Sequence, residues 1–365
     1  MKLKRYWIKT FGCQMNQADS ERIALTLEKQ GYQRAASIDQ ADLIVINSCI
    51  VRQSAENRVY GLIRNLSAQM SKCPNVQIVL TGCLAGWALR GQKKTNLERL
   101  RKRVGPQVTI KLTEDLIETK FLADLGCLQL EDDAQADWAK IPISQGCNQL
   151  CSYCIVPYAR GPEVYRPAAE ILTEVNRFLS QGYRQILLLG QTVNSWKGKG
   201  KVKTFAQLLA LVAQLAPQAT INFVSANPWD FSDQLIEVIA KHPNISRTIH
   251  LPVQSGDNEI LRRMRRPYTV EEYLALVKKI KQSIPGVKIT TDIIVGFPGE
   301  DKAAFERTVK LCRQVNFARA FIGKYSPRPG TIAAQLYPDE VPPQEKKRRW
   351  WILENLINRK GVDKN

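Results

Sequence analysis

The chain has 365 residues, 44% of them hydrophobic, and a formal net charge of +19 at pH 7. At roughly 150 residues per domain, this length predicts two or three domains. No apolar run reaches the roughly 18 residues of a membrane span, and the start, MKLKRYWIKTFGC, lacks the apolar core and cleavage site of a signal peptide. We therefore expect a cytoplasmic protein, in which nine cysteines indicate ligands, catalysts or buried thiols rather than disulfides.

Basic residues gather in four separate stretches, at 97–103, 197–203, 262–266 and 346–349. Any one of them alone is more simply a solvated face than a binding site. Together they favour a polyanionic partner, for which nucleic acid is the usual candidate. No basic amphipathic helix stands out that would favour a membrane surface instead.

The first 130 residues alternate between strand and helix patterns. Apolar, β-branched runs predict strands at 6–11, 42–47 and 76–82. The segments after them predict helices at about 16–30, at about 52–70 and up to about 103. Such alternation predicts a parallel sheet covered on both faces, a flavodoxin-like or Rossmann-like domain over 1–130. An acidic, weakly patterned linker follows at 131–139.

The alternation restarts after the linker. We predict six further strands with helices between them, near 140–145, 185–190, 220–225, 247–253, 287–295 and 317–325. Six strand–helix units are too few for an eight-stranded barrel and predict an open, partial (β/α)6 barrel over 140–342. The remaining residues, 343–365, predict one basic helix with Trp350 and Trp351 in it. The predicted fold class is therefore α/β, a parallel-sheet domain followed by a partial barrel.

Three cysteines stand close together in GCNQLCSYC, residues 146–154. Cys147, Cys151 and Cys154 follow a predicted strand directly, where parallel α/β folds bind their ligands. Soft thiolates select iron–sulfur clusters or zinc. Three of them can hold three irons of a 4Fe-4S cluster and leave the fourth iron open to substrate. A zinc site or a chance grouping is the alternative.

Three more cysteines each follow a predicted strand of the first domain. Cys13 comes after IKTFG, Cys49 after LIVINS and Cys83 after QIVLTG. Neighbouring parallel strands present their carboxyl ends side by side, so these distant thiols could converge on one edge of the sheet. A single cysteine in such a place would be an ordinary buried residue. Three of three favour a second cluster.

The CxxxCxxC pattern after the first strand of a partial barrel resembles the radical S-adenosylmethionine (SAM) superfamily. The resemblance implies that SAM binds the open iron through its amino and carboxylate groups and is cleaved to a 5′-deoxyadenosyl radical. Tyr153, between the last two cysteines, matches the aromatic residue usual there.

With a three-cysteine site in each domain, the chain resembles the methylthiotransferases of that superfamily. Within them it is most similar to the branch that modifies isopentenyladenosine in tRNA, above all in GCQMN at 12–16. The residues that carry the resemblance span nearly the whole chain: 10–21, 46–58, 81–83, 146–161, 187–196, 250–264, 291–300 and 325–331.

This resemblance implies a reaction that consumes two SAM molecules. The cluster held by Cys13, Cys49 and Cys83 would bind sulfur and accept a methyl group from one SAM, while the barrel cluster cleaves the other. A methylthio group would then pass to C2 of N(6)-isopentenyladenosine at tRNA position 37. The implied partners are the tRNA anticodon stem-loop, a reductant such as flavodoxin or ferredoxin, and a sulfur donor. We expect a monomer with no membrane association.

Matching positions also imply contacts to SAM. Gly190 and Gln191 would hold the methionyl amino group, Gln254 and Ser255 would lie near the ribose, and the stretch from Ile294 through Gly296 to Glu300 would flank the adenine. Taken alone, GFPGE in that stretch is a turn signal with no cofactor meaning.

Two departures from the family pattern stand out. RGPEVYRP at 160–167 replaces the more basic run that related enzymes carry there, and we expect the small terminal β-barrel that grips tRNA to be absent. The alternatives are the same chemistry on threonylcarbamoyladenosine tRNA or on a ribosomal protein, or a non-catalytic iron–sulfur or zinc protein that binds nucleic acid. We also predict that Arg262, Arg263, Arg265 and Arg266 contact RNA phosphates, unless they form a solvated helix face.

Overall fold

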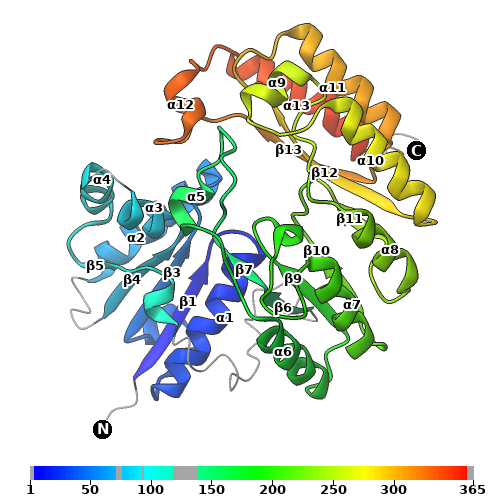
Figure 1. Ribbon diagram of the computed structural model, residues 1–365. Coiled ribbons are helices and arrows are strands. Elements are labelled where there is room, and N and C mark those ends of the chain that lie inside the picture. Colours follow the sequence, from blue (N-terminus) through cyan, green and yellow to red (C-terminus); the bar gives the residue numbers. More distant parts are fainter. Residues whose placement is uncertain (1–3, 71–75, 92–93, 118–137, 360–365) are drawn as a thin grey trace, which may run out of the picture. The chain divides into compact units, whose positions relative to one another are not determined.

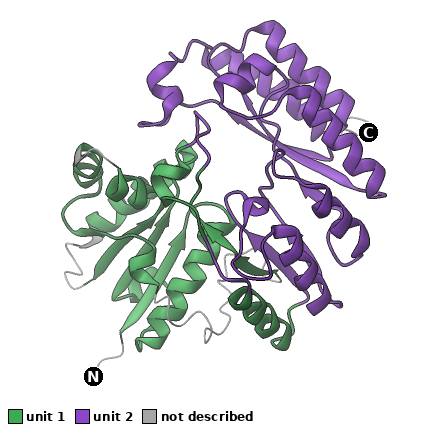
Figure 2. Cartoon of the chain, in the orientation of Figure 1, with its two compact units in different colours: residues 1–148, 155–164, 169–183 green, residues 149–154, 165–168, 184–365 purple. Residues whose placement is uncertain are grey.

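The computed structural model describes residues 4–70, 76–91, 94–117 and 138–359. The chain divides into two compact units (Figure 2). Unit 1 comprises 1–148, 155–164 and 169–183, and unit 2 comprises 149–154, 165–168 and 184–365. Most of the predicted linker at 131–139 lies outside the described residues, and Trp138 already begins a strand. The predicted domain boundaries stay a prediction.

Unit 1 is built on a five-stranded parallel sheet in the order β2-β1-β3-β4-β5 (Figure 1). The strands are β1 (Arg5–Thr10), β2 (Gln33–Arg34), β3 (Leu43–Ser48), β4 (Gln77–Gly82) and β5 (Val108–Ile110). Every residue of β3 is buried, as expected of a central strand covered on both faces. The sequence predicts the three longer strands but not β2 and β5, because two or three residues carry no periodic signal.

Helices cover both faces of this sheet. They are α1 (Gln14–Lys29), α2 (Gln53–Met70), α3 (Cys83–Arg90), α4 (Lys94–Val104) and α5 (Val156–Arg160). A sixth helix, α6 (Ala168–Ser180), follows β8 and lies almost entirely in unit 1. Alternate residues of the central strands enter two separate hydrophobic clusters, with Ile44 and Ile46 in one and Leu43 and Val45 in the other. Side chains alternate between the faces of a strand, so the predicted two-sided cover is confirmed.

Three short strands precede or flank the cysteine-bearing loop. They are β6 (Trp138–Pro142), β7 (Ser144–Gln145) and β8 (Val164–Tyr165). β6 lies against α1, where Lys140 Nζ is 3.3 Å from Glu21 Oε1. Short 3-10 turns occur at Ile38–Gln40, Glu114–Leu116 and Val193–Ser195.

Unit 2 contains two sets of parallel strands. β9 (Gln185–Leu189) pairs with β10 (Thr220–Phe223), and β11 (Thr248–His250), β12 (Lys288–Val295) and β13 (Arg319–Lys324) pair in that order. Together with β6, these strands lie at the six positions predicted from residue 140 onward. The α/β fold class is confirmed.

The helices of unit 2 alternate with its strands. They are α7 (Phe205–Leu215), α8 (Asp233–Lys241), α9 (Asn258–Arg263), α10 (Val270–Ser283), α11 (Lys302–Val315), α12 (Ile332–Leu336) and α13 (Pro343–Ile357). α13 is the predicted basic helix. It packs on β13, where Trp350 Nε1 donates to the Ile322 carbonyl (2.9 Å).

Candidate functional site

Cys13, Cys49 and Cys83, the first triad, lie at one edge of the sheet in unit 1. Cys49 and Cys83 directly follow β3 and β4, and Cys13 follows β1 after a short turn. These strands are neighbours, with Thr10 opposite Asn47 and Ser48 opposite Gly82. A negative charge on Cys13 or Cys49 would raise the pKa of the Cys83 thiol, which indicates that the three lie near one another. The structure therefore brings together the three thiols that the strand ends predict to converge.

Two buried asparagines tie the strand ends beneath the first triad. Asn16 in α1 donates to Asn47 Oδ1 (3.0 Å) and to the Ser48 carbonyl (3.2 Å), and Asn47 donates to the Asn16 carbonyl (2.8 Å). Gly82, at a φ of 84°, is required here, because a Cβ would overlap Asn47 Oδ1 and the Ser48 backbone. The backbone that presents Cys49 and Cys83 is thus fixed by packing and amide hydrogen bonds.

A buried arginine faces the first triad. Arg160, the last residue of α5, is 7% exposed, and its Nη2 lies 3.0 Å from Asp19 Oδ2 in α1. The positive charge of its guanidinium also acts on the Cys83 thiol. Burial raises the pKa of Cys83 to about 11, and the Arg160 charge opposes that shift. Arg160 lies in the stretch that resembles the family, but the sequence gives no sign that its side chain belongs to the first triad.

Cys147, Cys151 and Cys154, the loop triad, occupy a short stretch after β7. Gly146, at a φ of 77°, leaves no room for a Cβ against the Pro162 carbonyl, and the Cys147 amide donates to the Gly161 carbonyl (3.1 Å). The Cys154 amide donates to the Cys151 carbonyl (3.0 Å), so these two residues share one tight turn. Cys147 is buried and belongs to unit 1, whereas Cys151 and Cys154 are partly buried and belong to unit 2.

The residues between Cys151 and Cys154 are clamped to distant parts of unit 2. Ser152 Oγ donates to the Arg263 carbonyl (2.7 Å), and the Ser152 amide donates to the Met264 carbonyl (3.0 Å). The Ser152 carbonyl accepts from the Ala333 amide (2.7 Å). Tyr153 packs against an apolar cluster that includes Met264, and burial raises the pKa of its phenol well above the usual value. Tyr153 therefore acts as a neutral aromatic support.

The basic run at 262–266 does not form a single helix face. α9 ends at Arg263, and Arg265 has a left-handed φ of 55° that reverses the chain. Arg266 consequently points at the loop triad, where its Nη1 donates to Cys151 Sγ (3.3 Å). The prediction that Arg266 contacts phosphate is wrong for this reason. Arg262 and Arg263 both pair with Glu259, at 2.8 and 2.9 Å, and with Arg265 they stay predicted phosphate contacts.

The predicted SAM contacts lie at the carboxyl ends of strands in unit 2. Gly190 and Gln191 directly follow β9, Gln254 and Ser255 lie beyond β11, and Ile294 and Gly296 are at the end of β12. The Gln254 backbone joins the β12 register, since its amide donates to the Asp292 carbonyl (2.8 Å) and its carbonyl accepts from Ile294 (3.0 Å).

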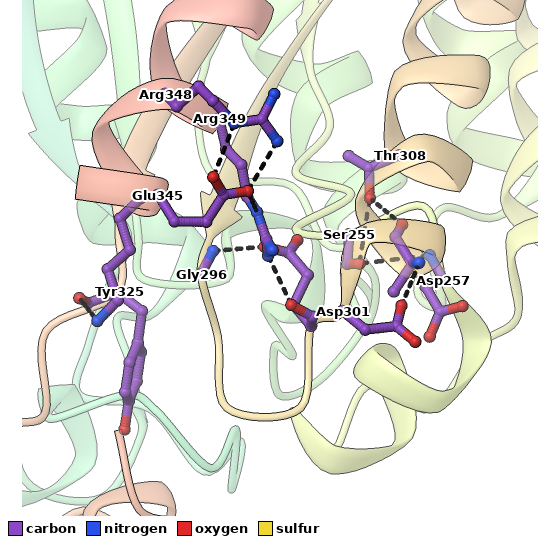
Figure 3. Close-up of polar contacts among 12 residues, drawn as sticks. Ser255, Asp257, Gly296, Asp301, Thr308, Tyr325, Glu345, Arg348 and Arg349 are labelled. Atoms are coloured by element: carbon purple, nitrogen blue, oxygen red, sulfur yellow. Dashed lines mark hydrogen bonds and ion pairs between the residues drawn. The ribbon is translucent and has the colours of Figure 1, made fainter. Parts of the chain in front are cut away.

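Ser255 differs from the other predicted SAM contacts because its hydroxyl is used inside the protein (Figure 3). The side chain is fully buried, accepts from the Asp257 amide (3.3 Å) and lies 3.5 Å from Thr308 Oγ1. Asp257 in turn caps α9 through the Ile260 amide. A SAM contact from this position would therefore come from the backbone, and the Ser255 assignment stays a prediction.

Side chains of α13 contact the turn at 296–300 and fix its position (Figure 3). Glu300 accepts hydrogen bonds from the Gly296 amide and from Arg349 Nη1 (2.8 Å), and neither charged side chain is more than 6% exposed. Burial raises the pKa of Glu300, and the Gly296 hydrogen bond and Arg349 oppose that shift. Lys346 fills the space where a Gly296 side chain would lie. The sequence identifies Arg349 and Lys346 only as members of a basic helix and gives no sign that they contact the turn at 296–300.

The donor chemistry at both triads suits iron–sulfur clusters. Three soft thiols are available in each triad. At the first triad, Arg160 Nη2 and Asp19 Oδ2 are both buried and have no hydrogen-bond partner among the described residues. Within the described ranges, no group of three His, Cys, Asp or Glu side chains is arranged to hold a metal ion. Cluster ligands bind separate irons and need not converge on one point. No helix in the described part of the chain is long and apolar enough to cross a membrane.

Comparison with known proteins adds sequence evidence along the whole chain. The Radical SAM superfamily model matches residues 141–312, and the Uncharacterized protein family UPF0004 model matches 5–101. A tRNA-2-methylthio-N(6)-dimethylallyladenosine synthase of Thermotoga petrophila is 40% identical over 98% of this chain and 83% of that protein. The chain belongs to this synthase family. Members from Clostridium botulinum and Chlorobium phaeobacteroides are 39% and 38% identical, over 99% and 97% of this chain and 83% and 82% of theirs.

Solved structures share the fold of this synthase-family member at low identity. The radical SAM methyltransferase TsrM from Kitasatospora setae superposes with a TM-score of 0.61 and 12% identity, over 92% of this chain and 77% of that one. The radical SAM enzyme OxsB gives a TM-score of 0.56 at 11% identity, over 96% of this chain and 56% of that one. Membership of the radical SAM superfamily implies one 4Fe-4S cluster and SAM.

Proposed function

We propose that this protein transfers a methylthio group to C2 of N(6)-isopentenyladenosine at position 37 of tRNA. The carrying observation is the pair of three-cysteine sites, one assembled from three adjacent strand ends and one in the CxxxCxxC loop. The 40% identity to a synthase named for that product supports the choice of substrate. A protein that only binds nucleic acid would need neither site.

The two triads have separate roles in this proposal. Cys147, Cys151 and Cys154 hold the cluster that binds SAM, and Cys13, Cys49 and Cys83 hold a second 4Fe-4S cluster that carries the sulfur to be transferred. Bound in this way, cluster and SAM supply a carbon radical able to attack an aromatic C–H bond, which side-chain acid–base chemistry cannot reach. The protein's own residues hold and orient the clusters, SAM and the substrate, and they exclude water.

Residues at the strand ends of unit 2 would orient SAM. In this proposal the backbone around Gly190, Gln191, Gln254 and Ser255 lines the methionyl and ribose side. Ile294 and Gly296 flank the adenine, and the Glu300–Arg349 pair keeps that turn in place. Tyr153 supports the loop triad from its apolar side.

The proposal extends to partners. The tRNA anticodon stem-loop must present the adenosine unstacked so that C2 is accessible. A reductant such as flavodoxin or ferredoxin and a sulfur donor are required by the chemistry. We propose a cytoplasmic monomer, organised as a sheet domain with the second cluster, a partial (β/α)6 barrel with the SAM-binding cluster, and a basic C-terminal helix.

Nucleoside mass spectrometry of tRNA tests the proposal. Cells that lack the gene should accumulate N(6)-isopentenyladenosine and lose its 2-methylthio derivative. The wild-type gene should restore the derivative, and so should Cys312→Ala, which removes a buried thiol on α11 that is a member of neither triad. Alanine at all three positions of either triad should not. Loss of a methylthio group from threonylcarbamoyladenosine or from a ribosomal protein instead would redirect the proposal to that substrate.

A further inference from the structure

Arg266 is held in one orientation by polar contacts on every side of its guanidinium. Nη1 donates to Cys151 Sγ (3.3 Å), Nη2 donates to the Pro252 carbonyl (3.3 Å), and Nε donates to Tyr268 Oη (3.3 Å). Tyr268 is itself fixed, because its hydroxyl donates to the Val253 carbonyl (2.8 Å). The contact to Cys151 is therefore the result of a constrained guanidinium, not of a freely rotating surface side chain.

Aromatic rings complete the surroundings of Arg266. Its guanidinium carbon lies 4.8 Å from the centre of the Trp229 ring and 5.6 Å from that of Tyr268, and the two rings stack on each other. A planar guanidinium can stack and make several directed hydrogen bonds at once, whereas a lysine ammonium is a point charge on a flexible stem. The site is thus specific for arginine.

We propose that Arg266 is a positioning residue of the loop triad: its hydrogen bond holds the Cys151 thiolate and stabilises negative charge on it. The inference rests on the proposed function, because it requires a cluster at this thiol. Reduction by one electron makes such a cluster more negative, and a neighbouring cation with an N–H···S bond favours the reduced form. Arg266 therefore raises the reduction potential and makes the cluster easier to reduce.

The same run of sequence provides a matched control. Arg262 belongs to the same basic stretch, but its side chain is 73% exposed and bonds Glu259 instead of a thiol. Arg262→Met and Arg266→Met remove the same charge. Only the second removes a donor to Cys151.

The test isolates the loop triad in a Cys13→Ala/Cys49→Ala/Cys83→Ala background. After anaerobic reconstitution, a redox titration followed by electron paramagnetic resonance gives the midpoint potential of the remaining cluster. Arg266→Met should lower the ratio of reduced to oxidised cluster at a given potential by about tenfold or more, which is 59 mV for one electron. Arg266→Lys should recover part of that shift, and Arg262→Met should leave the potential unchanged.

The outcomes separate this inference from the proposed function. A background protein that takes up no iron contradicts the cluster assignment itself. A cluster that forms but has the same potential in Arg266→Met and its parent overturns the role of Arg266. If Arg266→Met binds no iron, Arg266→Gln and Arg266→Lys decide: a lower potential in Gln than in Lys supports the proposal, and equal potentials overturn it. Loss of iron from all three variants, with a lowered unfolding temperature of the iron-free protein, assigns Arg266 a structural role and also overturns it.

Discussion

The two triads present three thiols in different ways. The first triad takes one cysteine from the end of each of three adjacent strands, so the register of a parallel sheet sets their spacing. The loop triad takes all three from residues 146–154, and distant segments fasten that stretch through Ser152 and Arg266. A site built on a sheet inherits the rigidity of the core, whereas a site built on a loop depends on individual contacts. The loop triad should therefore be the more sensitive of the two to single substitutions outside the cysteines.

Both triads have an arginine whose positive charge lies near one thiol, but only Arg266 forms a hydrogen bond to it. Arg160 meets Cys83 and is buried with Asp19 as its counter-charge. Arg266 meets Cys151 and is partly buried against aromatic rings. A carboxylate partner offsets the positive charge, so Arg160 should affect its triad less strongly through charge than Arg266 does.

Removal of the cysteines should have the largest effect and should separate the two triads. Alanine at Cys147, Cys151 and Cys154 should abolish reductive SAM cleavage and methylthio transfer together. Alanine at Cys13, Cys49 and Cys83 should abolish transfer but leave SAM cleavage intact. Each change should remove about half of the roughly eight irons expected for two 4Fe-4S clusters. Iron analysis and the yield of 5′-deoxyadenosine measure both effects, and equal loss of SAM cleavage in both variants would contradict the division of labour.

Substitution of Arg160 should have the next largest effect, on the stability of unit 1. Arg160→Met leaves the buried Asp19 carboxylate without its partner, which should cost about 3–5 kcal/mol of the free energy of unfolding. Arg160→Met/Asp19→Asn should recover much of that loss, because no charge is then left buried. Chemical denaturation of the iron-free protein measures both variants.

The control for Arg160 is an exposed ion pair. Lys279 is 51% exposed and lies 2.6 Å from Asp233, which is 71% exposed, so Lys279→Met should cost about 1 kcal/mol or less. A loss in Arg160→Met no larger than in Lys279→Met would show that the buried Arg160–Asp19 pair stabilises the protein no more than a surface pair does.

The first triad could be predicted from the sequence because the ends of its strands are easy to recognise. LIVINS and QIVLTG are apolar, β-branched runs, and a cysteine directly after such a run must lie at the carboxyl edge of a parallel sheet. The position of the Arg160 side chain beside this triad could not be predicted in the same way. It stands 77 residues after Cys83 in the numbering (160 − 83), and the direction in which α5 turns after the cysteine loop is decided by tertiary packing, such as the close approach of Gly86 to the Ala159 carbonyl.

Loss of the Ser152 clamp should have a smaller effect, confined to the loop triad. Ser152→Ala removes the hydrogen bond to the Arg263 carbonyl and leaves that group unpaired, at a cost of about 1–3 kcal/mol. In the background without the first triad, the cluster should lose iron faster to a chelator. Ser180→Ala removes a hydrogen bond of similar length (2.8 Å) from an exposed hydroxyl and should leave the rate unchanged. Equal rates for the two variants would mean that the loop is held without Ser152.

Arg266 shows where a periodicity argument fails. LRRMRR fits a helix with a basic face, and that pattern predicts four surface arginines that contact RNA phosphates or solvent. The structure ends α9 at Arg263 and places Arg265 at a φ of 55°, a conformation that residues other than glycine rarely adopt. Propensity scales do not predict this backbone conformation for an arginine, because it is imposed by the surrounding tertiary contacts. Because the chain reverses here, Arg266 donates a hydrogen bond to Cys151, and only Arg262, Arg263 and Arg265 remain as predicted RNA contacts.

The smallest expected effect concerns RNA binding by these three arginines. Phosphate contacts release counterions, so log affinity should fall linearly with log salt, with a slope of about −0.9 per contact in duplex regions. Arg262→Gln/Arg263→Gln/Arg265→Gln should flatten the slope by less than the value for three contacts, because Glu259 already pairs with two of the side chains. All tRNAs should weaken alike, since phosphate contacts position the RNA without reading its sequence. Alanine at either triad should leave the slope unchanged, because thiols make no phosphate contacts. Fluorescence binding over a salt series, with isopentenylated and unmodified tRNA, measures these slopes. Parallel lines with equal affinity for wild type and triple variant would make 262–265 a solvated surface, and RNA binding would then have to rest on exposed lysines and arginines elsewhere, such as those at 197–203.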